Sequence, residues 1–530
     1  MNDKKQTFLH GAALLALATV IVKIIGAFYK IPLKMIIGDQ GYGYFITAYD
    51  IYTVLLLIST AGLPIAMSRM ISEASSLGNY NQVRRIYATA RGIFLGLGIA
   101  STALMMGFAH QLAAFQKQPD AWASIFCLGP CALLMCIMST SRGFFQGQGN
   151  MRPTSTSQVL EAFFKLVVGL VLAYAVMKAT KSVAYAAGAA ILGVTVSCLV
   201  SALYLHGKWR PAYRELPETS DAPLSYGKTA KELLAIAVPI TIGSAGLQVL
   251  TVIETNLYMG QLLTANGMSQ AVADTTKGIY NMCQTVFNMP CAFMVPITTS
   301  VLPAITAFLA VGNHTDAKAT QESAARVTGL ISLPCAVGLS VLAGPVMGLL
   351  GGYTGENLAL AGTILTVLGM NVFFYGVIQY TNVLLQSHGY AHIPVINTLI
   401  CGGMKLVVVY LLVGNPQIGI VGAPVGMLLC YLCIGVMNLI AINKVVPQKV
   451  QVLRNLLRPV LPAAIMGVVV WAAYRIILLL PFSSRIITCG VPVALGAVVY
   501  AVCVVMFKSL RREDCLLLPK GDKIANFLRL

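Results

Sequence analysis

The sequence predicts an all-α integral membrane protein with about fourteen transmembrane helices. Apolar residues make up 57% of the 530 residues and charged residues only 10%, which is more apolar surface than one water-soluble core could bury. Uncharged apolar runs of roughly 20 residues, the length needed to cross the hydrocarbon core of a bilayer, recur along the chain. These runs lack the strict alternation of transmembrane β-strands, so helices are the expected element.

The expected helices follow one another with short polar connections. Two examples of the runs are "AAGAAILGVTVSCLVSALYL" in the first half and "ALAGTILTVLGMNVFFYGVI" in the second. The centres of the expected spans lie near Val20, Leu55, Gly98, Leu133, Val168, Gly193, Gln248, Ala292, Val337, Asn371, Lys405, Cys430, Val470 and Val498.

Basic residues outnumber acidic ones by 36 to 18, an excess that in a soluble protein would favour a nucleic-acid partner. In a membrane protein the same excess is explained by the positive-inside rule, because most Lys and Arg fall in the tails and inward loops when the N-terminus is cytoplasmic. We therefore expect a multi-pass protein with both termini in the cytoplasm and no nucleic-acid partner.

Two similar halves are joined by a polar stretch between His206 and Glu232. Gln146 and Gln386 each precede a glycine by three residues and a lysine by nineteen, which indicates a duplicated six-helix unit. A second pair of similar segments is "MISEASSLGN" in the first half and "AITAFLAVGN" in the second. The predicted organisation is an N-terminal lobe of six helices (1–206), a cytoplasmic linker (207–229), a C-terminal lobe of six helices (230–442), two further helices (443–508) and a cytoplasmic tail (509–530).

Ionisable side chains at bilayer depth are the candidate functional residues, because burying a charge in lipid costs several kcal/mol unless it is compensated. Duplicated helical bundles in membranes usually carry substrate at the interface of the repeats. The candidates within or beside the expected spans are Lys23, Lys30, Asp50, Glu161, Lys165, Glu254 and Lys405.

Several roles for these charges are open from sequence. Glu161 and Lys165 are one helical turn apart and can pair on one face, either as a structural ion pair or as part of a site. Lys23 has no acid within a turn, which favours a water-filled cavity or an anionic ligand. Asp50 and Glu254 can oppose the lysines across the bundle or act as protonatable or cation-binding coupling groups.

Enzyme chemistry is not expected. The sequence contains no phosphate-binding loop, no His-Glu-x-x-His and no Gly-x-Ser-x-Gly motif, and its thirteen cysteines form no metal-binding pattern. The four acids of the expected outer loops, Asp39, Asp120, Asp274 and Glu356, are widely separated in sequence and are expected to stay apart. No cofactor is therefore predicted, and the expected energy source is an ion gradient, of Na⁺ or H⁺, the membrane potential or the substrate's own gradient.

Three stretches carry a family resemblance. "VKIIGAFYKIPLKMIIGDQGYGYFITAYDIY" from Val22, "STAGLPIAMSRMISEASSLGNY" from Ser59 and "SRGFFQGQGNMRPTSTSQVLEAFFK" from Ser141 resemble the stage V sporulation protein B and polysaccharide biosynthesis branch of the multidrug/oligosaccharidyl-lipid/polysaccharide exporter superfamily. The lipid II flippases belong to the same superfamily. The resemblance covers nearly the whole chain and places it in a bacterial plasma membrane.

The resemblance implies two six-helix lobes plus two extra helices, with a V-shaped central cavity that alternates between membrane faces. It implies as cargo an undecaprenyl-diphosphate-linked saccharide, such as a peptidoglycan or other cell-wall precursor. Lys23 matches a cavity arginine of the lipid II flippases, and Lys30 or its neighbour Tyr29 matches a second. Lys277 is the candidate substitute for a basic residue of the eighth helix.

Ion coupling is also implied by the resemblance. Glu254 matches the acid that some lipid II flippases use for sodium. A polar partner expected in the eleventh helix falls near Lys405, which suggests a built-in cation beside Glu254.

Other functions on this scaffold are also considered. A cation-coupled multidrug exporter of the MATE type would use Asp50 and Glu254 to bind protons or cationic drugs, whereas a positive cavity favours a diphosphate. A third candidate is a non-transporting scaffold of the sporulation or wall machinery, and cell-wall synthesis enzymes are possible partners of the transporter. An intramembrane glycosyltransferase or ligase would need acids or histidines gathered at the outer interface, which the sequence does not indicate.

Overall fold

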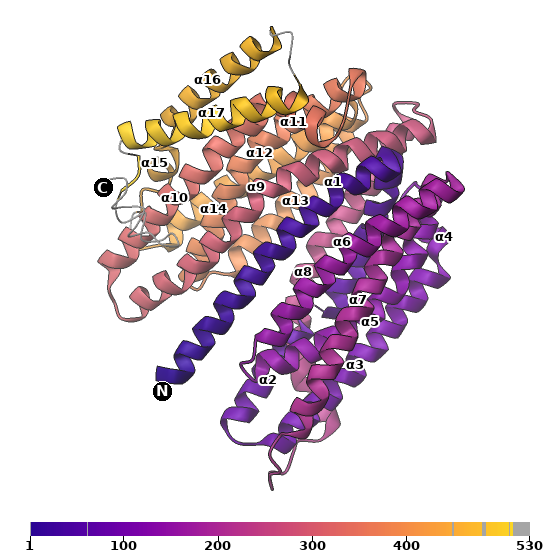
Figure 1. The fold of residues 1–530 in the computed structure, drawn as a ribbon. Coiled ribbons are helices and arrows are strands. Elements are labelled where there is room, and N and C mark those ends of the chain that lie inside the picture. The colour runs from indigo at the N-terminus through magenta and orange to yellow at the C-terminus, as the bar shows by residue number, and fades with distance from the viewer. Residues whose placement is uncertain (1, 61, 448–449, 480–483, 508, 512–530) are drawn as a thin grey trace. The chain divides into compact units, whose positions relative to one another are not determined.

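The computed structural model describes residues 2–60, 62–447, 450–479, 484–507 and 509–511, and these contain helices and no strand. The first half of the chain forms α1 (Asn2–Thr60), α2 (Leu63–Ser76), α3 (Tyr80–Gly107), α4 (Ala109–Phe115), η1 (Pro119–Ala121), α5 (Trp122–Gly147), α6 (Arg152–Thr180), α7 (Val183–Arg214) and α8 (Tyr226–Thr264). The remainder forms α9 (Gln270–Ala310), α10 (His314–Val341), α11 (Ala343–Leu350), α12 (Gly355–Ser387), α13 (His392–Val413), η2 (Gly419–Val421), α14 (Gly422–Val445), α15 (Val452–Leu457), α16 (Val460–Leu478) and α17 (Arg485–Met506). The α-helices are labelled in Figure 1.

The predicted all-α membrane fold is confirmed. Within the described residues, 11 helices are long and apolar enough to cross a membrane. Helices α8 and α9, of 39 and 41 residues, are also longer than the roughly 20 residues that a span requires. The expected number of about fourteen spans stays a prediction.

The first helix is bent at a glycine. α1 runs for 59 residues, but Gly38 interrupts it with φ 69° and ψ −178°, a conformation open essentially to glycine alone. The kink divides α1 into two segments, which fits the two separate spans expected near Val20 and Leu55.

The chain divides into two compact units. Unit 1 comprises residues 1–263 and 267–278, and unit 2 comprises residues 264–266 and 279–530. Helix α8 and the first turns of α9 thus belong to unit 1, beyond the predicted end of the N-terminal lobe. The lobe boundaries at 206 and 230 stay predictions.

The two pairs of similar segments have the same local backbone geometry in both halves. Gly149 and Gly389 have φ of 77° and 86°, and the N–H of each donates to the carbonyl of the glutamine three residues earlier, at 3.0 Å in both cases. Gly78 and Gly312, with φ of 76° and 72°, end α2 and α9 in the same way. These left-handed glycine caps are why the two halves keep glycine at those positions.

The helix packing also repeats. In unit 1, α3 packs on α5, α5 on α7 and α6 on α7; in unit 2, α10 packs on α12, α12 on α14 and α13 on α14. The corresponding helix pairs occur in the same order along the two halves, as the similar sequence segments predict. This repetition supports a duplicated helical unit.

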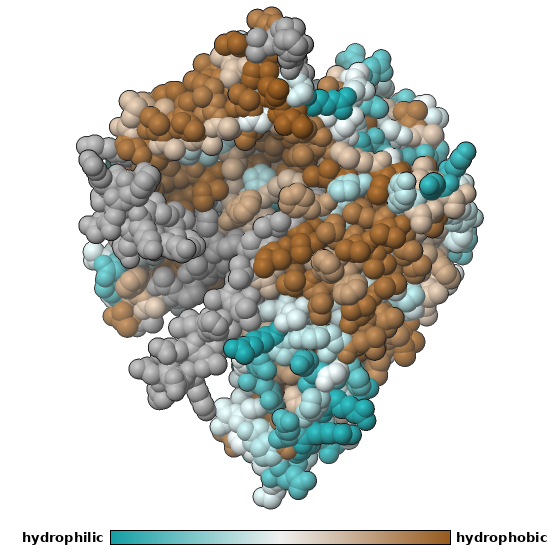
Figure 2. Space-filling model, viewed as in Figure 1, coloured by the Kyte–Doolittle hydropathy of each residue, from teal (hydrophilic) through white to brown (hydrophobic). Residues whose placement is uncertain are grey.

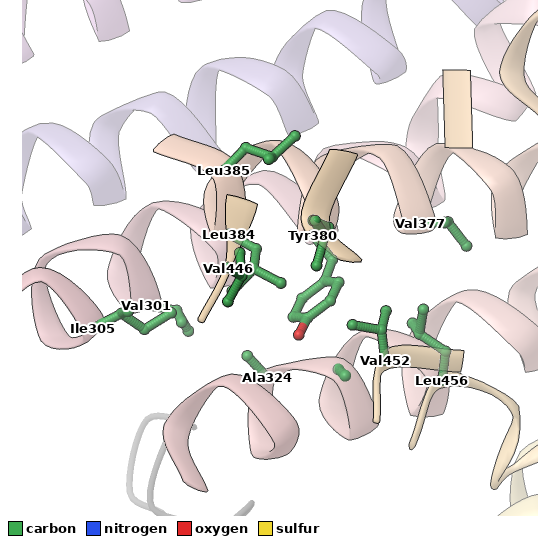
Figure 3. Close-up of a cluster of buried hydrophobic side chains, with 12 residues drawn as sticks. Val301, Ile305, Ala324, Val377, Tyr380, Leu384, Leu385, Val446, Val452 and Leu456 are labelled. Atoms are coloured by element: carbon green, nitrogen blue, oxygen red, sulfur yellow. The ribbon is translucent and has the colours of Figure 1, made fainter. Parts of the chain in front are cut away.

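The core of unit 2 contains a cluster of aliphatic side chains around Tyr380 (Figure 3). Its members come from α9, α10, α12, the end of α14 and α15, which brings the segment after α14 back onto the bundle. The Tyr380 hydroxyl donates to the carbonyl of Gln321 at 3.0 Å, so the buried polar atom is satisfied.

The helix surfaces are apolar, as expected for contact with lipid. On α6, Phe163, Val167, Val171 and Tyr174 form an exposed stripe at helical spacing, each more than 40% exposed. On the face drawn in Figure 2, hydrophobic side chains cover the middle of the unit 1 helices, and hydrophilic ones gather at the end where the α2–α3 turn lies.

The segment between α7 and α8 is bound to the start of α3. The carboxylate of Asp221 accepts hydrogen bonds from the N–H of Asn81 and Gln82 at 3.1 and 2.9 Å, and the Arg84 guanidinium donates to the carbonyl of Leu216 at 2.7 Å. Asp221 therefore caps the N-terminus of a helix distant in sequence. The structure places this connection at residues 215–225, inside the predicted linker 207–229.

Candidate functional site

Unit 1 brings most of the candidate charges into one electrostatic network. Asp50 in the second segment of α1 interacts with Lys30 in the first segment, with Lys277 in α9 and with Glu254 in α8. Lys30 also interacts with Lys165 of α6. Five candidates that are far apart in sequence are therefore close enough to influence one another's charge.

Lys277 lies at the most buried point of this network. Its side chain is fully buried, and its Nζ donates to Thr47 Oγ1 and, at 2.8 Å, to Gln118 Oε1. Helix α9 reaches this position because Gly278 packs directly against the backbone of Asp39, where a Cβ would lie 1.9 Å from the carbonyl oxygen. The hydration that this buried ammonium loses is compensated by hydrogen bonds to neutral oxygens and by the field of nearby carboxylates.

Next to Lys277, two of the expected outer acids meet at one tyrosine. The Tyr44 hydroxyl lies 3.0 Å from Asp274 Oδ2 and 3.3 Å from Asp120 Oδ2. Asp274 also accepts hydrogen bonds from Gln118 and Gln270, each at 2.9 Å.

The expectation that the outer acids stay apart is therefore wrong for Asp120 and Asp274. The packing of the α4–η1 turn and the start of α9 against α1 brings them together, and sequence separation does not report such long-range contacts. In the part of the chain that the structure describes, no group of three or more His, Cys, Asp or Glu side chains could hold a metal ion.

Lys165 lies against aromatic rings. Its Nζ is 4.6 Å from the centroid of Tyr49 and 5.3 Å from that of Tyr29, which are cation–π distances. Glu161, which from sequence could pair with Lys165 along the same helix, forms its ion pair with Arg142 of α5 at 3.0 Å. Lys165 and Glu161 still interact electrostatically.

The remaining candidates lie elsewhere or outside the description. The side chain of Lys23 lies outside the described residues. Lys405 lies in α13 of unit 2, so its predicted proximity to Glu254 of unit 1 stays a prediction. Glu254 itself is 7% exposed.

Three contributors to the network were not among the sequence candidates: Arg142, Gln118 and Tyr49. Tyr29 was named only as the alternative to Lys30. Arg142 belongs to the "SRGFFQGQGN" stretch and could have been weighed as the partner of Glu161, but Gln118 is in a short connection with no distinguishing pattern. The assembled arrangement, with cationic side chains held in a low-dielectric region by polar and aromatic groups, suits the binding of an anion.

Long apolar helices around buried charges define a polytopic membrane transporter. The polysaccharide biosynthesis protein family matches residues 8–309, more than half of the sequence, and the MatE family matches residues 272–411. The chain belongs to the polysaccharide biosynthesis protein family of the multidrug/oligosaccharidyl-lipid/polysaccharide exporter superfamily.

Three of the curated relatives are proteins of Bacillus subtilis. The chain is 27% identical to the uncharacterized membrane protein YabM, covering 99% of this chain and 97% of the relative. It is 23% identical to stage V sporulation protein B, over 97% and 98%, and 26% identical to the lipid II flippase MurJ, over 75% and 76%.

Two solved structures share the fold. An inward closed conformation of the lipid II flippase MurJ superposes with a TM-score of 0.70 at 14% identity, covering 94% of this chain and 99% of the other. An inward-facing MATE family multidrug transporter gives a TM-score of 0.61 at 15% identity, covering 82% and 99%. At these identities the likeness establishes the fold, and the predicted superfamily and membrane fold are confirmed.

Proposed function

We propose that this transporter flips an undecaprenyl-diphosphate-linked saccharide, a lipid II-like peptidoglycan or other cell-wall precursor, across the membrane by alternating access. The observation that carries the proposal is the group of three lysines, Lys30, Lys165 and Lys277, in one network of unit 1. A diphosphate headgroup loses its hydration in the membrane, and fixed ammonium groups replace it.

The lysines are expected to have different roles in binding the diphosphate. Lys165 and Lys30 contact the diphosphate, and Lys277 supplies a buried positive field from the start of α9. Lys23 precedes Lys30 on α1 by seven residues, about two helical turns, and is proposed as a further contact to the diphosphate. Asp50 and Glu161 limit the net positive charge when no cargo is bound, so that the empty transporter stays stable.

The direct test is transport in proteoliposomes that contain a fluorescent undecaprenyl-diphosphate saccharide, with dithionite quenching to report its leaflet. Lys165→Gln and Lys277→Met should each slow flipping about tenfold or more, since each removes a charge from the network. The matched control is Lys178→Gln, an exposed lysine of the same helix as Lys165, which should flip at the wild-type rate. Wild-type protein that leaves the probe on its original leaflet would rule out the proposal.

A cell experiment extends this test. The wild-type chain should rescue a bacterium depleted of its lipid II flippase, and its Lys23→Ala variant should rescue poorly. Accumulation of labelled precursor on the inner leaflet after depletion of this chain separates a flippase from a non-transporting scaffold.

We propose that coupling to Na⁺ or H⁺ acts through Glu254, with Lys405 as a built-in cation near it. Lys405→Met should then make flipping dependent on sodium, whereas a wild-type protein that already needs sodium at Glu254 contradicts this role for Lys405.

A MATE-type multidrug exporter is the second candidate, because the MatE family matches residues 272–411 and Asp50 and Glu254 lie in the same network as the lysines. It predicts efflux of ethidium that Asp50→Asn abolishes. The flippase predicts no ethidium efflux and binding of diphosphate lipids instead.

A further inference from the structure

Lys277 and Asp274 lie three residues apart on α9, a spacing at which a lysine and an aspartate ordinarily pair. Both side chains are almost fully buried, with exposures of 0% and 1%, which would strengthen such a pair. The structure, which describes both residues, gives them no direct ion pair. Another group separates the two charges.

That group is the side-chain amide of Gln118. Its Oε1 accepts from Lys277 Nζ at 2.8 Å and from Thr47, and its Nε2 donates to Asp274 Oδ1 at 2.9 Å. An amide can accept from an ammonium at one end and donate to a carboxylate at the other, which a carboxylate or a hydroxyl in that place could not do equally well. Gln118 is itself fully buried.

The local backbone fixes this amide in position. Lys117 adopts a left-handed conformation, with φ 57°, and the N–H of Gln118 donates to the carbonyl of Ala113 at 3.0 Å, so the chain turns directly after α4. Gly43 leaves room for the amide, since a Cβ there would lie 3.3 Å from Nε2. Gln118 therefore enters the space between α1 and the first turns of α9 in a defined orientation.

Asp274 is meanwhile satisfied by neutral donors. Tyr44 donates to Oδ2 at 3.0 Å, and Gln270 and Gln118 donate to Oδ1, each at 2.9 Å. The carboxylate thus has three hydrogen bonds without drawing on the ammonium of Lys277. Lys277 and Asp274 still interact electrostatically, but the ammonium makes no direct hydrogen bond to this carboxylate and is therefore less strongly neutralised than in a contact ion pair.

We propose that Gln118 is a positioning residue that keeps Lys277 from forming a contact ion pair with Asp274, so that the buried ammonium keeps more of its positive field for a diphosphate headgroup. The inference rests on the proposed function and assigns a role to a residue of a connecting turn. Gln118 acts through Lys277 and does not contact the cargo.

The test uses the purified full-length protein in detergent, with undecaprenyl diphosphate as the probe and undecaprenol as the uncharged comparison, and measures binding by native mass spectrometry. Gln118→Ala should weaken binding of the diphosphate about tenfold, because Lys277 can then pair with Asp274. The double variant Gln118→Ala/Asp274→Asn should recover most of that loss, since the competing carboxylate is gone. A residue that serves only folding would not be rescued in this way.

Two further variants keep the result interpretable. Gln116→Ala removes an equally buried glutamine of the same turn, which bonds the carbonyl of Val252 at 3.4 Å, and should bind like wild type. Gln118→Glu is nearly isosteric and places a carboxylate directly at Lys277, so it should also lose diphosphate binding even if the alanine variant does not fold.

Failure of this inference and failure of the proposed function give different results. If wild type prefers the diphosphate but the double variant binds as weakly as Gln118→Ala, or Gln118→Glu binds like wild type, the role of Gln118 is overturned. If wild type binds undecaprenyl diphosphate no better than undecaprenol, the proposed function itself fails.

Discussion

Arg142 of α5 and Glu161 of α6 form an ion pair in which Nη2 and Oε2 are 3.0 Å apart. The pair joins two helices through side chains that are 12% and 25% exposed. Because Glu161 is occupied by this arginine, Lys165 one turn further along α6 lies instead over the rings of two tyrosines. The pair therefore decides which cation of this region remains available for a ligand.

Arg142→Ala should destabilise the protein by about 2 kcal/mol, since it removes a hydrogen bond to a charged group and leaves Glu161 partly buried. Unfolding in detergent, followed by intrinsic fluorescence, measures the change. Arg142→Ala/Glu161→Ala should cost less than the sum of the two single variants. Strict additivity would mean that the two side chains do not interact in solution.

The hydroxyl of Tyr49 should affect stability, and its ring should affect ligand binding. Its buried hydroxyl has no hydrogen-bond partner among the described residues, whereas its ring lies 4.6 Å from Lys165 Nζ. Tyr49→Phe should leave stability unchanged or raise it by about 1 kcal/mol, because an unsatisfied polar group is removed while the ring is kept.

Tyr49→Leu should behave differently from Tyr49→Phe. It removes the cation–π contact with Lys165, worth about 1 kcal/mol, and should weaken binding of undecaprenyl diphosphate while Phe does not. Binding by native mass spectrometry provides the comparison. Equal binding by the Phe and Leu variants would contradict a role for the ring in orienting Lys165.

The fold class and the repeat could be predicted from sequence because both depend on local signals. Apolar length indicates spans, and the caps at Gly149 and Gly389 follow from a glycine three residues after a glutamine in each half. Lys30, Asp50, Lys165 and Glu254 could be named for the same reason, since an ionisable residue within or beside an apolar run is visible in sequence. Lys277 was named only through the family resemblance, and Arg142 was missed.

The partners of those charges could not be predicted, because they depend on how distant helices pack. Glu161 has a lysine four residues away in sequence, yet its partner is an arginine nineteen residues earlier, which requires the rotation of α5 against α6. Asp120 lies in η1 and Asp274 in the first turns of α9, and the two carboxylates meet at the hydroxyl of Tyr44. Gln118 carries no charge and interrupts no apolar run, so nothing in the sequence marks it.

The kink of α1 at Gly38 should be sensitive to substitution. A Cβ there would meet no atom within 4 Å, so the cost of Gly38→Ala is the backbone conformation at φ 69° alone, about 1–3 kcal/mol. The loss should appear as a lower midpoint of thermal unfolding. Gly26→Ala is the matched control on the same helix, with equally open space and no positive φ, and should not destabilise; a similar loss in both variants would argue against a special conformation at Gly38.

The docking of the linker on α3 should weaken in acid. Although desolvation acts in the opposite direction, hydrogen bonds from Thr219 and from the N–H groups of Asn81 and Gln82 lower the pKa of Asp221 below its ordinary value. Because the pKa of Asp221 is lower in the folded protein than in the unfolded chain, the ionised cap stabilises the docked linker fully above the ordinary Asp pKa of about 3.9. This stabilisation is lost as the pH falls through the lowered pKa. Docking should therefore be insensitive to pH near neutrality.

Asp221→Ala should release the linker at every pH, because the first N–H groups of α3 lose their acceptor. Hydrogen exchange at Asn81 and Gln82 and limited proteolysis between residues 215 and 225 should both become faster at pH 7. Glu218→Ala, an exposed acid of the same linker, should change neither measurement. If exchange at Asn81 is the same in the Asp221 and Glu218 variants, the carboxylate does not hold the linker and water caps the helix instead.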